Sequence, residues 1–284
     1  MNATPSVPAT VAGLLVAAQR LGVARLDAQW LLAHHLQRPR SWLLAHDDHA
    51  LPEADAAALL GQLHQRAAGV PLAYLTGERG FYGLRLQVTP AVLDPRPDTE
   101  TLVDWALERL RADALIAPRV LDLGTGSGAI ALAVQHACPQ AEVHASDLSP
   151  AALAVAQANA ARLGLPVQFH LGAWWQALPA TARWHLVLSN PPYVAAGDPH
   201  LPALRHEPAM ALVPPGGDGL AALREIVRGA PAHLHPGGWL LLEHGHDQGE
   251  AVTALLQTAG FADIGHRRDL GGRQRCTGGR WPGG

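Results

Sequence analysis

The chain contains 284 residues, of which 48% are hydrophobic and 16% are charged, and its formal net charge is −3. This apolar content excludes an intrinsically disordered protein, and the length is sufficient for one large domain or two smaller ones. No run of about 18 apolar residues without a charge occurs, so no transmembrane helix is expected. All 21 basic residues are arginine, which excludes Schiff-base formation and a P-loop lysine.

The cysteine content and the first eight residues indicate in which cellular compartment the protein is expected. Cys138 and Cys276 are the only cysteines, so a disulfide framework is excluded and a reducing environment is favoured. Residues Met1 to Pro8 have neither a basic segment nor an apolar one, so no secretory leader is expected. The net acidic charge argues against a broad surface for nucleic acid. We therefore expect a cytoplasmic protein with no membrane partner, and nucleic acid is not expected as a partner.

The first quarter of the chain is predicted to be helical. Apolar residues between Thr10 and Gly69 recur at helical spacing, and no stretch alternates as a strand does. Pro39 and Pro52 interrupt this region, which predicts four or five short helices. We therefore place a small all-helical domain at residues 1–70.

Residues 71–97 differ in composition and are predicted to form a β-hairpin or an extended linker. They mix glycines, aromatic residues and alternating apolar positions between Tyr74 and Val88. A stiff Pro-Arg-Pro-Asp-Thr-Glu sequence follows at residues 95–100. Asp98 is predicted to be the N-cap of a helix that runs to about Arg111.

From residue 98 to residue 284 the pattern alternates between strands and helices. Such alternation indicates a parallel sheet with helices on both faces, to which a final pair of strands adds an antiparallel edge. The predicted fold class is thus α/β. The expected strands are 119–123, 142–146, 167–171, 185–189, 239–243, 262–268 and 274–280, and the expected helices after Arg111 are 129–137, 150–163, 219–235 and 248–260.

A glycine-rich loop stands where the first strand meets the first helix of this region. Gly124, Gly126 and Gly128 permit a tight turn, and Asp147 follows at the end of the next strand, where it could accept hydrogen bonds from ribose hydroxyls. The spacing is G-x-G-x-G and not the G-x-G-x-x-G of dinucleotide folds. It suits S-adenosylmethionine, a nucleoside with an amino-acid end; the alternative is a turn that binds no ligand.

The tetrapeptide Asn190-Pro191-Pro192-Tyr193 follows the fourth strand. The prolines fix the backbone and remove two donors, so the Asn190 carbonyl and the nearby backbone carbonyls remain as acceptors. Two acceptors can hold the N–H groups of an amide or exocyclic amine and direct its nitrogen at an electrophilic methyl group, while Tyr193 packs on the planar group. The alternative is a rigid turn without a chemical role.

These motifs resemble those of class I S-adenosylmethionine-dependent methyltransferases that modify planar NH2 groups. Nearly the whole chain resembles the bacterial release-factor glutamine methyltransferases (the HemK/PrmC family), including residues 95–100, Trp174, Glu207-Pro208, 216–220 and 241–245. The resemblance implies a Rossmann-like methyltransferase domain with a mostly parallel seven-stranded sheet, after a helical domain that recognises the substrate. It also implies methylation of the glutamine in the Gly-Gly-Gln motif of peptide chain release factors 1 and 2.

The resemblance also implies roles for individual residues. Asp147 would hold the ribose, Trp174 would line the adenine site, and Asn190, the catalytic residue, would contact both the cofactor and the glutamine amide. Ala173 and His206 depart from the family pattern, which commonly has an acidic and an aromatic residue there. The implied contacts to S-adenosylmethionine come from Gly124, Thr125, Gly126, Ser127 and Gly128, and Pro191, Pro192 and Tyr193 would complete the amide site.

Other functions remain open at this point. The same tetrapeptide would serve a ribosomal-protein glutamine methyltransferase or an adenine-amino methyltransferase of nucleic acid, and a binding module without catalysis is a third reading. Arg96, Asp98 and Glu100 either cap a helix and form surface ion pairs or contact the substrate. Sixteen histidines are present, but no zinc motif is, so no metal is expected. We expect a monomer.

Overall fold

The computed structural model describes residues 9–283, so the prediction about residues 1–8 lies outside the described residues. The chain divides between Glu78 and Arg79 into two compact units. None of the described helices is long and apolar enough to cross a membrane.

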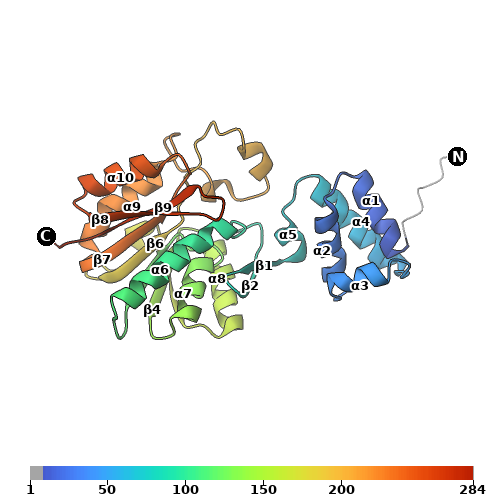
Figure 1. The fold of residues 1–284 in the computed structure, drawn as a ribbon, viewed down its shortest axis with the longest axis horizontal. Coiled ribbons are helices and arrows are strands. Elements are labelled where there is room, and N and C mark those ends of the chain that lie inside the picture. Colours follow the sequence, from blue (N-terminus) through green and yellow to red (C-terminus); the bar gives the residue numbers. More distant parts are fainter. Residues whose placement is uncertain (1–8, 284) are drawn as a thin grey trace. The chain divides into compact units, whose positions relative to one another are not determined.

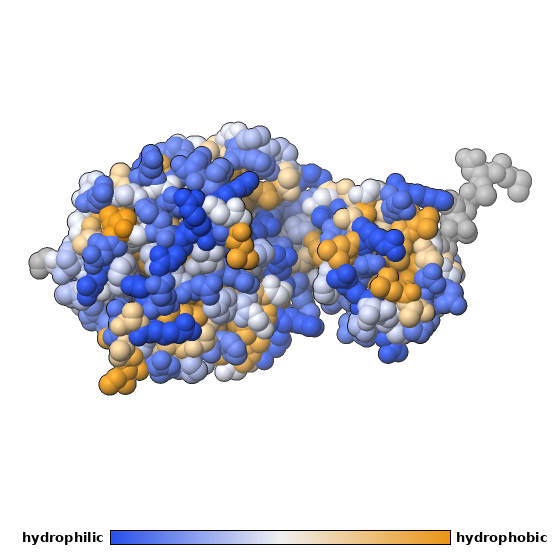
Figure 2. All heavy atoms as spheres, in the orientation of Figure 1, coloured by the Kyte–Doolittle hydropathy of each residue, from blue (hydrophilic) through white to orange (hydrophobic). Residues whose placement is uncertain are grey.

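The first unit consists of helices, as the sequence predicts. Its apolar stripes face one another and bury a core that includes Leu14, Leu31 and Leu59. Figure 2 shows hydrophobic residues on the surface of this unit. The large apolar side chains that are exposed there include Trp30 and Leu44. The helices are α1 (Val11–Arg20), α2 (Arg25–His35), α3 (Arg40–Ala45), α4 (Glu53–Ala67) and α5 (Leu72–Thr76).

The predicted hairpin is present and belongs to the core of the second unit. Gly77 ends α5 in the left-handed conformation at φ +73°, and strands β1 (Glu78–Phe81) and β2 (Leu84–Gln87) pair after it. Phe81, Leu84 and Leu86 are buried among the helices of this unit. The hairpin is therefore part of the packed domain and not a free linker.

A seven-stranded sheet forms the centre of the second unit (Figure 1). Its strand order is β5-β4-β3-β6-β7-β9-β8; the first five of these are parallel, and β9 runs antiparallel to both of its neighbours. The predicted antiparallel edge is thus confirmed. The strands are β3 (Arg119–Leu123), β4 (Glu142–Asp147), β5 (Val167–Leu171), β6 (Trp184–Ser189), β7 (Leu234–Glu243), β8 (Ala262–Arg268) and β9 (Gln274–Arg280).

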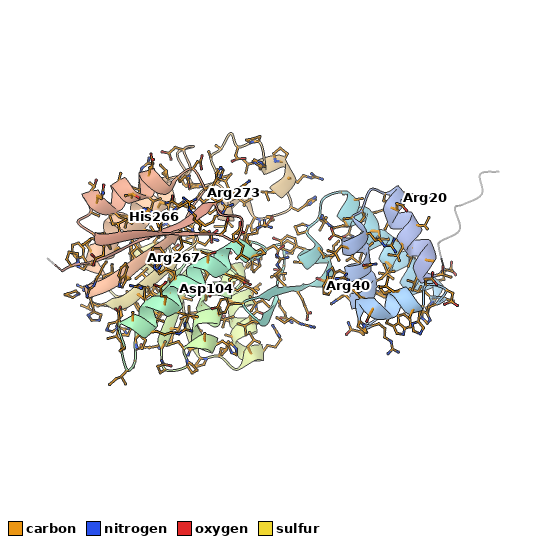
Figure 3. All side chains as sticks on the ribbon, in the orientation of Figure 1. Arg20, Arg40, Asp104, His266, Arg267 and Arg273 are labelled. Carbon is orange, nitrogen blue, oxygen red and sulfur yellow. The ribbon has the colours of Figure 1, made fainter. Side chains whose placement is uncertain are left out.

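Helices cover both faces of this sheet, because its central strands are apolar on both sides. Val120 of β3 packs in one hydrophobic cluster and Leu121 packs in the other. Arg267 of β8 is labelled in Figure 3. Its guanidinium carbon lies 4.7 Å from the ring centre of Trp105. The helices are α6 (Glu100–Ala112), α7 (Ala129–Ala137) and α8 (Pro150–Leu163) on one face, and α9 (Ala221–Gly229) and α10 (Gly249–Thr258) on the other.

Two local predictions were wrong. The helix predicted at 219–235 ends at Gly229, because Pro231 lacks an N–H and a 3₁₀ turn at Ala230–Ala232 follows; β7 then begins at Leu234. Asp98 does not cap α6. It lies in a 3₁₀ turn, Pro97–Thr99, and its carboxylate pairs with Arg275 at 3.3 Å.

Candidate active site

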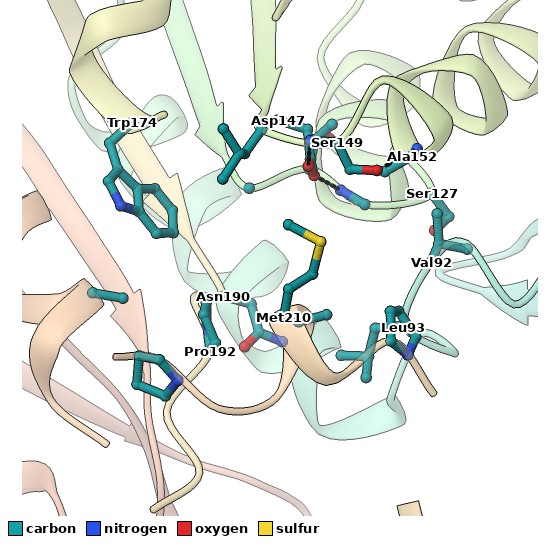
Figure 4. A pocket seen from close by; sticks show the side chains of 18 of the residues that line it. Val92, Leu93, Ser127, Asp147, Ser149, Ala152, Trp174, Asn190, Pro192 and Met210 are labelled. Carbon is teal, nitrogen blue, oxygen red and sulfur yellow. Dashed lines mark hydrogen bonds between the residues drawn. The ribbon is translucent and has the colours of Figure 1, made fainter. Parts of the chain in front are cut away.

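A pocket of about 760 Å³ lies at the carboxyl ends of β3, β4 and β6 (Figure 4). This is the edge at which open parallel sheets bind ligands. Most of the predicted site residues line it: Gly124, Thr125, Gly126, Ser127, Asp147, Trp174, Asn190 and Pro192. The structure thus brings the glycine loop (residues 124–128) and the asparagine turn (residues 190–193) to one pocket.

Gly128, Pro191 and Tyr193 are not among the residues that line the pocket. Gly128 precedes α7 at φ +85°, and a Cβ there would lie 2.9 Å from the side chain of Leu132, so this glycine serves close packing. Pro191 is buried. The Tyr193 hydroxyl donates a hydrogen bond to Glu243 Oε1 at 3.3 Å, and burial raises the pKa of this tyrosine.

The two motifs are joined through adjacent strands. Leu123 and Ser189, the last residues of β3 and β6, are paired in the parallel register. The buried hydroxyl of Ser189 also donates to the carbonyl oxygen of Leu123 at 2.7 Å. The glycine loop and the asparagine turn therefore begin from one rigid pair of residues.

The glycine loop turns sharply and is held by the backbone of β4. The N–H groups of Gly124 and Thr125 both donate to the carbonyl oxygen of Ser146 at 2.9 Å. Gly124 and Gly126 have φ values of +73° and +56°, which favour glycine. The space where a Cβ on Gly126 would stand is open, so a ligand can approach the backbone there.

Asp147 is fixed by two backbone groups. Its Oδ2 accepts a hydrogen bond from the N–H of Gly126 and its Oδ1 accepts one from the N–H of Ser149, both at 2.9 Å (Figure 4). Each carboxylate oxygen has a second lone pair and can accept a further hydrogen bond. The carboxylate is therefore oriented in advance for hydroxyl donors in the pocket.

A second carboxylate, Asp122, supports the loop from the interior. It is fully buried, and its Oδ2 accepts hydrogen bonds from the Thr125 hydroxyl at 2.6 Å and the Ala131 N–H at 3.3 Å. Burial raises the pKa of Asp122 to about 7, although these two hydrogen bonds lower it. The sequence placed Asp122 next to the loop without predicting this role.

The adjacent Trp174 and Trp175 occupy different environments. Trp174 lines the pocket, and a Cβ on Gly124 would lie 3.3 Å from its ring. Trp175 instead stacks on His233 and donates its indole N–H to the carbonyl oxygen of Ile226 at 3.1 Å. Only the first of the two tryptophans is therefore placed to contact a ligand in this pocket.

The side chain of Asn190 reaches the pocket floor (Figure 4). Its Nδ2 donates a hydrogen bond to the Thr99 hydroxyl at 3.1 Å. Because the nitrogen is engaged there, Oδ1 is the free end of the amide and can accept a hydrogen bond from a substrate.

The charged residues of the Pro-Arg-Pro-Asp-Thr-Glu sequence have partners within the protein. Arg96 lines the pocket and pairs with the buried carboxylate of Glu207, which also accepts from the Asp94 N–H at 3.2 Å. Burial raises the pKa of Asp94, although the positive charges of Arg79 and Arg96 lower it in part. Glu100 Oε1 accepts from a backbone N–H of the hairpin at 2.8 Å. These contacts favour a structural role for Arg96 and Glu100.

Sequence reasoning missed one wall of the pocket. Met210, Val213 and Glu225 contribute to it. Met210 lies between Tyr193 and Gly219 in a segment that makes its own backbone hydrogen bonds, from Val194 N to Leu212 O at 2.9 Å and from Ala196 N to Gly217 O at 3.1 Å. This segment has no periodic pattern, so nothing in the sequence indicated which of its residues face the pocket.

The pocket suits S-adenosylmethionine. Its volume lies within the range of about 300–1,000 Å³ that is usual for small ligands and cofactors. The Trp174 ring offers a flat apolar wall, Asp147 offers an oriented carboxylate, and the open space at Gly126 exposes backbone to a ligand. Within residues 9–283, no group of three or more His, Cys, Asp or Glu residues could hold a metal ion.

Comparison with known proteins gives the family. Residues 12–77 match the model of the PrmC N-terminal domain, and residues 100–207 match that of the methyltransferase small domain. The release factor glutamine methyltransferase of Bordetella pertussis is 54% identical over 91% of this chain and 95% of the relative. That of Xylella fastidiosa strain Temecula1 is 51% identical over 98% of this chain and 100% of the relative.

Solved structures agree on the fold. A methyltransferase from Pyrococcus furiosus aligns with a TM-score of 0.52 at 17% identity, covering 71% of this chain and 90% of the other. A 16S rRNA methyltransferase of T. thermophilus, solved with AdoMet and guanosine, aligns with a TM-score of 0.55 at 21% identity, covering 72% of this chain and 49% of the other. The chain belongs to the family of release factor glutamine methyltransferases, which confirms the expected S-adenosylmethionine-dependent protein-glutamine methyltransferase.

Proposed function

We propose that the protein transfers a methyl group from S-adenosylmethionine to the side-chain amide nitrogen, N5, of the glutamine in the Gly-Gly-Gln motif of peptide chain release factors 1 and 2. This reaction would modulate translation termination in the cytoplasm. The observation that carries the proposal is the position of Asn190, whose amide oxygen is free in the same pocket that holds the glycine loop and Asp147.

The residues of the pocket divide into two groups. Gly124 to Gly128, Asp147 and Trp174 would bind the cofactor; Gly128 would contribute through its place at the start of α7. When bound, S-adenosylmethionine supplies an electrophilic methyl carbon whose bond to sulfur breaks as the bond to the substrate nitrogen forms. In our proposal, Asp147 accepts hydrogen bonds from the ribose, and Trp174 packs against the adenine.

Asn190 and the turn after it would orient the acceptor. An amide nitrogen is a weak nucleophile because its lone pair is delocalised into the carbonyl group. Asn190 Oδ1 and a backbone carbonyl of the turn would accept hydrogen bonds from the two N–H groups and thereby direct the nitrogen at the methyl group. Pro191 would keep the turn rigid, Pro192 would border the amide site, and Tyr193 would support it through Glu243. The nitrogen releases its proton once it has been methylated, so no base needs to ionise it first.

The helical unit is proposed to grip the release factor. Leu26, Trp30 and Leu44 are large apolar residues whose exposed fractions are 49%, 48% and 65%. A Leu44→Glu variant should lose activity on the whole factor and keep it on a short Gly-Gly-Gln peptide. Equal activity of this variant and the wild type on the whole factor would contradict this role for Leu44.

The direct test is mass spectrometry of release factors 1 and 2 after incubation with the protein and S-adenosylmethionine. We expect a mass increase of one methyl group on the glutamine of the motif, and none when that glutamine is replaced by glutamate. A ribosomal protein and duplex DNA serve as competing substrates, and preferential labelling of either one would overturn the proposal. Size-exclusion chromatography tests the expected monomer.

A further inference from the structure

A group of polar side chains next to Asn190 comes from three separate segments of the protein, and one of them, Thr99, also lines the pocket. The group consists of Thr99 at the start of α6, Glu243 at the end of β7, and Tyr193 in the turn after β6. The Asn190 Nδ2 donates to Thr99 at 3.1 Å, and the Tyr193 hydroxyl donates to Glu243 at 3.3 Å. Thr99 and Glu243 are both buried, with exposed fractions of 4% and 1%.

Thr99 does not perform the usual task of a threonine at its position. It is the residue before the first turn of α6, where a threonine hydroxyl commonly accepts a hydrogen bond from a backbone N–H of its own helix. Here the side chain makes no such capping bond. Its hydroxyl instead accepts from Asn190, and Thr99 is one of the groups that lower the pKa of the Glu243 carboxylate, whose buried Oε2 has no hydrogen-bond partner among the described residues.

A Thr99 proton directed at this unpartnered carboxylate oxygen would leave one orientation for the Asn190 amide. A threonine hydroxyl has one proton to donate, and an ionised carboxylate can only accept. When the Thr99 proton is directed at Glu243, Thr99 can only accept from Asn190, so the amide nitrogen must face Thr99. The amide oxygen must then face the pocket.

We propose that Thr99 and Glu243 are positioning residues that hold Asn190 with its amide oxygen toward the substrate. The proposal rests on the proposed function, because only an acceptor of N–H groups needs this orientation of Asn190. Without the Thr99 hydroxyl, the amide can rotate by half a turn and present its NH2 group, which would repel the substrate amide.

The charge of Glu243 determines the direction of the hydrogen bonds. The groups that act on this carboxylate are Thr99, Tyr193, Arg275 on β9 and Asp98 in the turn before α6, and Cys276 lies opposite it in the register of β7 and β9. A protonated Glu243 could donate to Thr99, which would free the Thr99 proton for the Asn190 oxygen and reverse the amide. Turnover should therefore rise with pH as Glu243 ionises, and this rise should require the Thr99 hydroxyl.

Thr99→Val and Thr99→Ser form the matched pair for the test. The valine keeps the shape and removes the hydroxyl, and we expect kcat on the release factor to fall by about ten- to a hundredfold, with the affinity for S-adenosylmethionine little changed. The serine keeps the hydroxyl and should restore kcat. Equal kcat in wild type and Thr99→Val, equal losses in both variants, or a loss confined to cofactor affinity would each overturn the proposal.

Glu243→Gln tests whether the two residues act through one another. It should flatten the rise of kcat with pH, and it should have little further effect in a Thr99→Val background. Fully additive effects would contradict a shared path. If Glu243→Gln does not fold, as judged by circular dichroism, the Thr99 pair still decides the question.

Proton exchange at the Asn190 side chain gives a readout that needs no turnover. In ¹⁵N-labelled protein, the Asn190 NH2 signal, assigned by its loss in Asn190→Ala, should exchange slowly with water in wild type and Thr99→Ser, and faster in Thr99→Val. Equal exchange in all three would refute the positioning role even if the wild type labels no release factor. Failure to label the factor would instead count against the proposed function.

Discussion

The carbonyl oxygen of Tyr193 occupies the space into which a Cβ on Gly219 would point. Gly219 also has φ +75°, and the Gln248 side chain, whose Nε2 donates to the same carbonyl at 3.0 Å, closes the remaining space. Gly219 therefore fixes the end of the asparagine turn by allowing the two backbones to approach. The motif depends on a residue far from it in the sequence.

Gly219→Ala should displace this turn. The new methyl group overlaps the Tyr193 carbonyl, so we expect a lower melting temperature and a large loss of methyl transfer. Gly217→Ala is the matched control, because Gly217 has a similar φ of +84° and open space around its Cβ position. The control should show only the backbone cost of about 1–2 kcal/mol. Equal melting temperatures and activities of the two variants would show that the close approach is unimportant.

Asn190→Ala should abolish methyl transfer. The substitution removes the amide that we propose as the acceptor for the substrate, and loss of one such orienting group costs on the order of a hundred- to a thousandfold in kcat. Binding of S-adenosylmethionine, measured by calorimetry, should be weakened but detectable. Turnover at the wild-type rate in this variant would remove Asn190 from the mechanism.

Asp147→Ala should weaken cofactor binding. A charge-assisted hydrogen bond contributes about 1.5–3 kcal/mol, which corresponds to a rise in Kd of roughly ten- to a hundredfold. The variant also removes the carboxylate that accepts hydrogen bonds from the N–H groups of Gly126 and Ser149. Asp198→Ala, which removes a carboxylate outside the pocket lining, is the control and should leave the Kd unchanged. An unchanged Kd for Asp147→Ala would show that the ribose contact is misassigned.

Asp122→Asn should alter how stability depends on pH. Burial raises the pKa of Asp122 from 3.8 to about 7 in the folded protein. Between these values the unfolded chain loses the proton while the folded protein keeps it, so the wild type loses stability as pH rises from about 4 to about 7. The asparagine variant does not titrate there.

The measurement is urea denaturation of both proteins at pH 5 and pH 7.5. The stability of Asp122→Asn relative to wild type should increase between these pH values, by on the order of a few kcal/mol. Glu243 titrates in both proteins, so its contribution cancels in the comparison. Parallel stability curves would mean that Asp122 remains ionised in the fold.

The sequence predicted most of the fold because its signals are local. The strands and helices between Arg119 and Leu171 follow from apolar runs and from breakers such as Gly164. The predicted helix extends past the true end of α9, because apolar residues continue beyond Pro231 at Ala232 and Leu234. The role of Asp98 was wrong because its partner, Arg275, lies near the other end of the chain.

The site was predictable to the extent that its chemistry lies in short motifs. Asp147 and Asn190 each end a strand, and the carboxyl ends of parallel strands meet at one edge. Thr99 and Glu243 could not be found in this way, because each looks like an ordinary residue of its own element. Their relation to Asn190 exists only after α6 and β7 have packed beside β6.

The pairing of Leu123 with Ser189 has a consequence for how such an enzyme can change its target. The glycine loop and the asparagine turn both start at this pair of residues on β3 and β6. The segment between Tyr193 and Gly219 leaves the sheet after the turn and makes backbone hydrogen bonds within itself. Glu207 of that segment also pairs with Arg96 and accepts from the Asp94 N–H outside it, so a grafted segment has to keep this carboxylate. A graft from a related enzyme at these two ends should redirect the methyl group to another nitrogen while the transfer geometry is inherited intact.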